Sequence, residues 1–163
     1  MRHVDLRAVE DDDLDAIFEM MRDRDAAEMV AFGAEDPDDR DAFDEWMSRR
    51  RASDEVDLLV VTEDGGFAGT AASFAVGADR EVSFWVARHA WGRGVATEAL
   101  RLLVAREPER PLFGRVAAHN AGAIAVFERN GFTELSRAPM HAPALGREVD
   151  EIVYVLTPAL DGV

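Results

Sequence analysis

A glycine-rich turn between an apolar strand and an amphipathic helix is the feature that most restricts how this chain can fold. The run Glu81–Ala87 (EVSFWVA) predicts a buried strand, and a helix is expected from about Gly94 to Arg106. The turn between them is Trp91–Thr97 (WGRGVAT), in which Gly92 and Gly94 are the glycines. The first turn of a helix has unpaired N–H groups and a partial positive charge, and glycines let an anion approach the backbone. The pattern therefore predicts an anion-binding helix N-terminus, although an isolated G-x-G more often forms a plain strand–helix turn.

The charges near this turn differ from those of the whole chain. Arg88 precedes the glycines and Arg93 lies between them, and both are expected to add charge-assisted contacts to a phosphate. The chain as a whole has a net charge of −15, and most of the acidic excess lies in its first 57 residues. Such a field repels nucleic acid and favours an amine or cationic partner. A solvated, solubilising surface is the alternative explanation of the acidic residues.

A second motif follows one strand later, at Asn120–Phe132 (NAGAIAVFERNGF). Asn120 stands where a helix N-cap is needed, Ile124 and Phe127 are expected to face the core, and Gly131 ends the helix. Taken alone, this segment is an ordinary capped helix.

The remaining elements predict a single domain over residues 1–163. Strands are expected at 4–9, 57–62, 67–76, 81–87, 112–118, 132–137 and 149–156, and helices at 11–22, 25–32, 38–51, 94–106 and 120–130. The segment 138–147, with two prolines, is expected to be irregular. This order predicts a mixed α/β (α+β) fold, in which one central sheet of six to seven strands has helices on both faces.

Composition excludes several kinds of chemistry. The chain has no Cys and no Lys, which removes disulfides, thiolate nucleophiles, Cys-ligated zinc, Schiff bases and the lysine of a Walker A loop. We expect no metal. No apolar run reaches the length of a membrane span and the N-terminus has no signal-peptide pattern, so we expect no membrane association and a cytoplasmic location.

Together the two motifs resemble those of the GNAT superfamily of N-acetyltransferases. The resemblance covers nearly the whole chain, and WGRGVATEAL and the NGF ending are typical of the branch that contains the ribosomal-protein-alanine acetyltransferases. It implies transfer of an acetyl group from acetyl-CoA to a primary amine, on a small molecule or a protein N-terminus, by direct attack in a ternary complex. It also implies a monomer or homodimer. A coenzyme A-binding sensor or partner module without transfer activity is the alternative.

The same resemblance implies a coenzyme site between two parallel strands that separate. Backbone groups of one strand pair with the pantetheine arm, the loop amides hold the pyrophosphate, and residues of the second motif contact the pantetheine and the thiol end. In this sequence the strand residues are Phe84, Trp85 and Val86, the loop residues are Gly92, Arg93, Gly94, Val95, Ala96 and Thr97, and the motif residues are Asn120 and Phe127.

This chain departs from its relatives at the positions that handle protons. Phe127 occupies the position of a tyrosine general acid, Arg115 that of a glutamate base, and Ala123 that of a common serine. The sole tyrosine, Tyr154, is expected in the core or at an interface. The candidates that remain for proton transfer are Glu81, Ser83 and His119, with His141 as a further histidine near the expected acceptor pocket.

Aromatic and acidic residues of the first half are candidates for the acceptor pocket. The aromatic candidates are Phe32, Phe43, Trp46 and Trp85, and the acidic ones near the mouth are Glu35, Asp36 and Asp38. For Phe43 and Trp46 a place in the core is the preferred interpretation.

Overall fold

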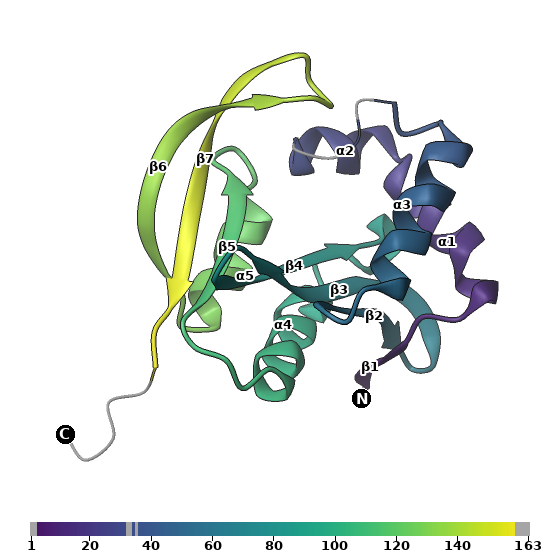
Figure 1. Cartoon of the computed structure of the whole chain (residues 1–163), viewed down its shortest axis with the longest axis horizontal. Coiled ribbons are helices and arrows are strands. Elements are labelled where there is room, and N and C mark those ends of the chain that lie inside the picture. Colours follow the sequence, from purple (N-terminus) through teal and green to yellow (C-terminus); the bar gives the residue numbers. More distant parts are fainter. Residues whose placement is uncertain (1–2, 32–33, 35, 159–163) are drawn as a thin grey trace.

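The computed structural model describes residues 3–31, 34 and 36–158, which form a seven-stranded sheet with helices on both faces (Figure 1). The strand order is β1-β2-β3-β4-β5-β7-β6. The strands are β1 (Val4–Ala8), β2 (Val56–Glu63), β3 (Gly66–Val76), β4 (Asp79–Val86), β5 (Leu112–Ala117), β6 (Thr133–Ala142) and β7 (Arg147–Leu156). Only the β4–β5 pair is parallel, and all other neighbours are antiparallel. The predicted fold class is confirmed.

The helices lie close to where the sequence predicts them. They are α1 (Leu14–Met21), α2 (Arg24–Val30), α3 (Arg40–Ala52), α4 (Val95–Arg106) and α5 (Ala121–Arg129), with short 3-10 turns η1 (Asp11–Asp13) and η2 (Arg88–Ala90). Side-chain caps start three of them, because Asp23, Asp39 and Asn120 accept hydrogen bonds from backbone N–H groups of the first turn. None of the helices in the described ranges is both long and apolar enough to cross a lipid bilayer.

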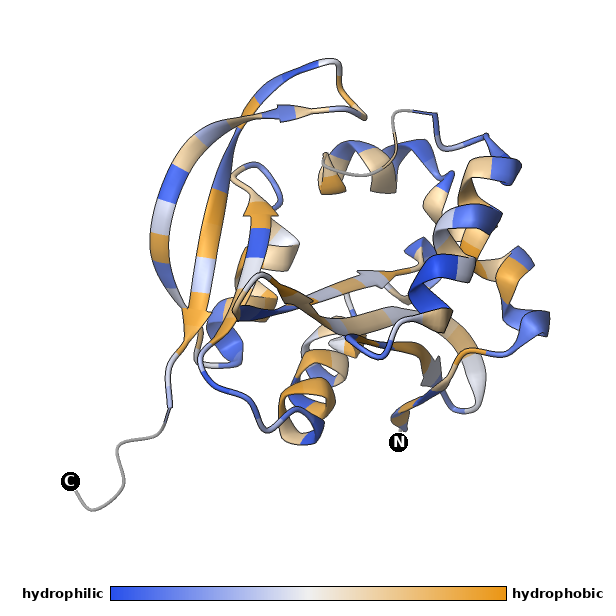
Figure 2. Ribbon diagram, viewed as in Figure 1, coloured by the Kyte–Doolittle hydropathy of each residue, from blue (hydrophilic) through white to orange (hydrophobic). Residues whose placement is uncertain are grey.

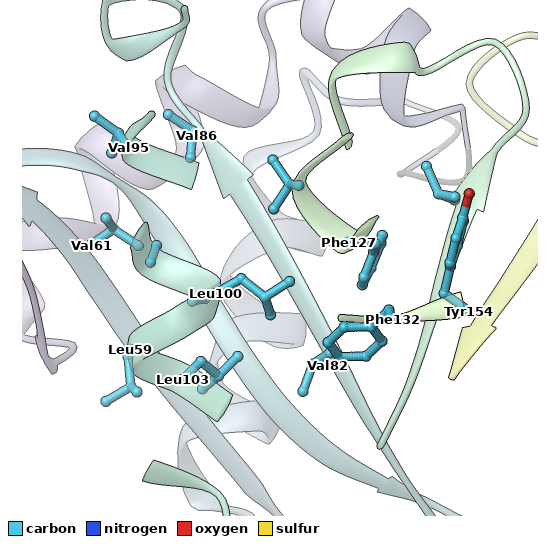
Figure 3. Packing of buried hydrophobic residues seen from close by; sticks show 14 of the residues in the cluster. Leu59, Val61, Val82, Val86, Val95, Leu100, Leu103, Phe127, Phe132 and Tyr154 are labelled. Atoms are coloured by element: carbon cyan, nitrogen blue, oxygen red, sulfur yellow. The ribbon is translucent and has the colours of Figure 1, made fainter. Parts of the chain in front are cut away.

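Two apolar layers hold the helices against the sheet. On one face, α4 and α5 pack on the central strands through a cluster that includes Leu100, Leu103 and Phe127 (Figure 3). On the other face, α1 and α3 pack through a cluster that includes Ile17 and Met47. Figure 2 shows apolar residues along α4 and the middle strands, and a largely hydrophilic outer side on α3. The periodic apolar stripes of these helices therefore decide which side each one turns to the sheet.

The β4–β5 pair opens soon after it forms. Its register contains two residue pairs, Arg80 with Leu112 and Glu81 with Phe113. Beyond them β4 stays paired with β3 as far as Val86, and β5 stays paired with β7. Each strand therefore keeps its outer partner while the inner edges separate, which leaves a gap in the middle of the sheet.

One segment differs from its predicted conformation. Residues 138–147 were expected to be irregular, but β6 continues to Ala142 and forms a hairpin with β7. Pro139 is tolerated because β6 is an edge strand. On the outer side of an edge strand no neighbouring carbonyl group needs the N–H that proline lacks. Pro139 therefore marks an edge strand, and the second proline, Pro143, lies in the turn between β6 and β7.

Candidate functional site

A cavity of about 570 Å³ lies where β4 and β5 separate. Its walls come from the end of β4, the loop that leads into α4, the first turn of α4, and the exposed face of α5. Ala26, Met29 and Val30 of α2 close it from the other side of the sheet. The lining thus combines the end of β4 with residues of α2, α4 and α5.

The N-terminus of α4 opens into this cavity. Gly94 is the N-cap residue, has a φ of +79° and gives no side-chain cap to the helix. A Cβ built on Gly92 or Gly94 would meet no atom within 4 Å, so the space in front of the backbone is open. Val95, Ala96 and Thr97, which follow, also line the cavity. A helix start without a side-chain cap, beside a cavity, has the geometry that anion sites use, and the sequence predicts such a site at this place.

The arginines of the loop do not point to this anion site. Arg88 binds Asp23, with Nε 2.9 Å from Oδ2, and its Nη2 lies 2.8 Å from an oxygen of Asp25. Arg93 forms an ion pair with Glu63. Both guanidinium groups therefore have carboxylate partners in this structure, and their contacts to phosphate stay a prediction.

Trp91 fixes the loop to the end of β4. Its indole Nε1 donates to the carbonyl oxygen of Val86 at 2.8 Å, while 44% of the residue stays exposed. Phe84, Trp85 and Val86 line the cavity beside it. The strand end and the glycine loop are thus held in one arrangement by a side-chain hydrogen bond.

Asn120 and Phe127, both expected at the coenzyme, differ in their surroundings. Asn120 lines the cavity and its Oδ1 accepts from the Ala123 N–H at 3.1 Å, which confirms the predicted cap. Phe127 is 2% exposed and lies in the core, with its ring stacked on Tyr154 and tilted against Phe84 (Figure 3). It is not among the described residues that line the cavity. Phe127 therefore packs against Phe84, which lines the cavity. The expectation that Phe127 lies beside the thiol end of the coenzyme is corrected to an indirect role, through this contact with Phe84.

Tyr154 is a core residue, which is one of the two locations, core or interface, that the sequence predicts for it. It is 4% exposed, and burial raises the pKa of its phenol, with Glu128 and Glu134 adding to the effect. A buried phenol with a raised pKa stays protonated near neutral pH.

Glu81 and Ser83 lie on the face of the sheet that α2 covers. Glu81 is buried, and Arg115 is held between two carboxylates, with Nε 3.2 Å from Glu81 and Nη1 3.0 Å from Glu151. Burial lowers the pKa of Arg115, but the hydrogen bond to Glu151 and the charge of Glu81 outweigh this and raise it. Ser83 is exposed on the same face. Neither Glu81 nor Ser83 lines the described part of the cavity.

His119 connects the β5–α5 loop to α2. Its Nε2 lies 2.8 Å from the carbonyl oxygen of Glu28. A carbonyl oxygen only accepts hydrogen bonds, so Nε2 carries the proton and Nδ1 is the acceptor atom when the ring is neutral. His119 precedes Asn120 in the chain, and Asn120 is the residue of this pair that lines the cavity.

The acceptor-side candidates separate into several groups. Phe43 and Trp46 pack with Phe18 in the core, as preferred. Trp85 packs against the same cluster and also lines the cavity.

The acidic candidates lie elsewhere. Asp36 and Asp38 line a second cavity of about 350 Å³ near α2, where Asp38 binds Arg22 at 2.9 Å. The described acidic candidates, Asp36 and Asp38, therefore do not line the main cavity. The residues of α2 that line it are apolar: Ala26, Met29 and Val30. His141 is exposed on β6. Phe32 and Glu35 lie outside the described residues.

Sequence reasoning missed the α2 residues and Arg129, all of which line the cavity. For Arg129 a signal existed, because Gly122, Ala125 and Arg129 recur at helical spacing on one face of α5. For Met29 and Val30 no local signal existed, since the position of α2 over the gap depends on tertiary contacts.

Comparisons with known proteins agree with this architecture. The sequence profile described as "Acetyltransferase (GNAT) domain" matches residues 3–133. A search of curated protein sequences gave no significant match.

Solved structures with the same fold include three acetyltransferases. A ribosomal-protein-alanine N-acetyltransferase from Brucella melitensis is 24% identical, covers 94% of this chain and 99% of its own, and has a TM-score of 0.78. A spermidine N-acetyltransferase from Vibrio cholerae, solved with CoA and spermine, is 19% identical over 94% and 95%, with a TM-score of 0.81. RimJ from Mycobacterium smegmatis, solved with a CoA disulfide, is 23% identical over 94% and 81%, with a TM-score of 0.78.

Proposed function

The chain belongs to the acetyltransferase (GNAT) domain family, and on this basis we propose that it moves the acetyl group of acetyl-CoA to a primary amine, on a small molecule or a protein N-terminus. One observation carries the proposal: the cavity in the gap between β4 and β5 ends at the open N-terminus of α4. A thioester in the gap and phosphates at the helix would occupy the two parts of this cavity. The similar structures from Vibrio cholerae and Mycobacterium smegmatis, both solved with forms of CoA, support the assignment.

The coenzyme contacts that we propose depend mainly on the backbone. The unpaired strand edge at the end of β4 is available to the amide groups of the pantetheine arm, and the loop and helix amides are available to the pyrophosphate. Asn120 uses Oδ1 for the helix cap, so its Nδ2 is the part that can donate to the pantetheine or to water. The proposed set is Phe84, Trp85, Val86, Gly92, Arg93, Gly94, Val95, Ala96, Thr97 and Asn120, with Phe127 as support for Phe84.

The proposed reaction is a direct displacement in one complex. The amine nitrogen bonds to the thioester carbonyl carbon, the carbonyl oxygen becomes an oxyanion, and the C–S bond then breaks to release the thiolate of coenzyme A. The amine loses one proton and the thiolate takes one up, so no covalent enzyme intermediate is required. A backbone N–H near the end of β4 is the group that we propose to stabilise the oxyanion.

We propose His119 as the proton acceptor, with Glu81 and Ser83 as the alternatives. The hydrogen bond to Glu28 fixes the His119 tautomer and leaves Nδ1 free to accept, whereas the Glu81 carboxylate is engaged by Arg115. The variants His119→Gln, Glu81→Gln and Ser83→Ala separate the three. The residue that accepts the proton is the one whose replacement lowers kcat about 100-fold or more with little change in KM.

Gly94→Glu tests the coenzyme assignment. It puts a carboxylate into the open space before the α4 amides, where it competes with and repels phosphate, so binding of acetyl-CoA should fall below detection by calorimetry. Gly77→Glu is the matched control: Gly77 also has a positive φ, of +61°, and open surroundings, but it lies in the β3–β4 turn. Both variants place a side chain at a positive φ in open surroundings, so the control accounts for the strain of such a substitution.

Transfer is measured as thiol release from acetyl-CoA with a panel of amines and peptide N-termini. Binding of acetyl-CoA without thiol release for any acceptor would favour a coenzyme-binding module without transfer activity. The absence of a hydroxyl group at Phe127 is the feature that favours this alternative. Unchanged affinity in Gly94→Glu would show that the phosphates bind elsewhere.

A further inference from the structure

The cavity has a marked shortage of positive charge for a phosphate-rich ligand. Among the described residues that line it, Arg129 is the single charged one. Arg88 and Arg93, which are nearest to the α4 amides in sequence, are engaged by carboxylates. In a chain of net charge −15, a polyanionic ligand therefore meets backbone dipoles and one guanidinium group.

The structure fixes the backbone of Arg129 next to the anion site. The neighbouring Asn130 donates from Nδ2 to the carbonyl oxygen of Thr97 at 3.2 Å and to that of Val126 at 3.0 Å. Thr97 belongs to the first turn of α4, so this side chain connects the end of α5 to the start of α4. Arg129 stands in the last turn of α5, beside the α4 amides and on the cavity wall.

Arg129 also differs from most arginines of the chain in having no carboxylate partner in the described ranges. It is exposed, and no ion pair or hydrogen bond of its guanidinium group is present there. Nearby, Arg101 on α4 pairs with Glu98, as most arginines of this acidic chain pair with a carboxylate. A cation in the last turn of a helix is favourable by itself, but this does not explain why it lines the cavity.

We propose that Arg129 binds the 3′-phosphate of the coenzyme ribose. The inference depends on the proposed function, in which the α4 amides hold the pyrophosphate. The 3′-phosphate is then the anionic group of the coenzyme that still needs a partner. The guanidinium group of Arg129, on the adjacent helix, offers a planar fork of N–H donors that can bind two oxygens of a dianionic phosphate. Arg129 would thereby distinguish coenzyme A from its dephospho form, which lacks that phosphate.

Calorimetry with coenzyme A and dephospho-coenzyme A tests this directly. The unmodified protein should bind coenzyme A at least about tenfold more tightly, as expected for a charge-assisted contact to a phosphate. Arg129→Gln should weaken coenzyme A about tenfold or more and dephospho-coenzyme A less than about twofold. Arg129→Lys, which keeps the charge but not the fork, should fall between them. Arg147→Gln is the control, since Arg147 is exposed on β7 and does not line the cavity.

Three outcomes would overturn the assignment to the 3′-phosphate. Equal losses for both ligands in Arg129→Gln would place the guanidinium at the pyrophosphate. No loss for either would remove Arg129 from the site. Failure of the unmodified protein to bind either ligand would refute the proposed function itself, which the first two outcomes leave intact. A thermal unfolding midpoint of Arg129→Gln within about 2 °C of the unmodified protein excludes a folding defect as the cause.

Discussion

Gly114 and Phe127 are predicted to be strongly coupled in stability. Gly114 lies on β5, and a Cβ at this position would be 2.3 Å from Cε1 and 2.4 Å from Cζ of Phe127. Carbon atoms in contact are about 3.5 Å apart or more, so the ring would have to move by about 1.2 Å. Phe84, Phe132 and Tyr154 surround the ring with centroid distances of 5.2–5.4 Å, which leaves it no space to retreat.

The magnitude follows from this geometry. Gly114→Ala should lower the free energy of unfolding by about 2–3 kcal/mol, at the upper end for an overpacked core. Phe127→Leu deletes the two clashing ring atoms and one more carbon, at a cost of about 2 kcal/mol. In the double variant the new methyl group enters the space that the ring has left. The double variant should therefore lose about 2–3 kcal/mol of unfolding free energy, well below the sum of the two single losses, about 4–5 kcal/mol. The difference is a coupling energy of about 2 kcal/mol.

Urea unfolding of the four proteins, followed by far-ultraviolet circular dichroism, measures this cycle. Losses that add to within about 0.5 kcal/mol would refute the packing of Phe127 over Gly114. A near-neutral Gly114→Ala would refute it as well, since the close approach then cannot exist in solution.

Two further predictions concern the site and the helix α2. Phe127→Tyr introduces the hydroxyl that the family resemblance implies at this position, but it places that hydroxyl without a partner in the core. We therefore expect a loss of about 1–3 kcal/mol in unfolding free energy and no gain in kcat. Faster thiol release with unchanged stability would contradict this. Asp23→Asn keeps the α2 cap but removes the ion pair with Arg88, whose hydrogen bond lowers the pKa of Asp23 below 3.8. A carboxyl group with a lowered pKa stabilises the fold at pH values above the pKa that it has in the unfolded chain. The variant should therefore unfold at a lower urea concentration at pH 6, and its unfolding free energy should be lower by less than about 1 kcal/mol, since the pair is partly exposed. This difference should shrink as the pH falls below 3.8. A difference that stays constant from pH 6 to pH 2.5 would rule out the ion pair as its cause.

The parts of the site that the sequence predicts are those set by local chemistry. Gly94 starts a helix with a left-handed φ, and Asn120 caps a helix with its own side chain, within three residues of each. Such features depend on neighbours in the chain, and sequence patterns record them directly. The order of strands and helices followed from apolar periodicity for the same reason.

The parts that escaped prediction depend on contacts between distant segments. Arg88 finds Asp23, 65 residues away, and Arg93 finds Glu63, 30 residues away, so their motif alone could not reveal that both are engaged. Phe127 stands at a motif position where the resemblance implies a tyrosine, yet its ring packs over Gly114, which lies on β5. The short helix α2, which lines one side of the cavity, takes its position from tertiary contacts that no local sequence pattern records.

The two residue pairs that join β4 to β5 also determine how the protein should respond to heat and solvent. Strands β1–β4 on one side and β5–β7 on the other are each complete antiparallel units, so the narrow connection is the natural place for them to open separately. A coenzyme that contacts the end of β4 and also Asn120, which follows β5, would link the two units and add about 2.7 kcal/mol of stability at a concentration 100 times its Kd. Amide protons on both sides of the gap should then exchange as one cooperative unit, which makes the ligand a structural member of the sheet as well as a reactant.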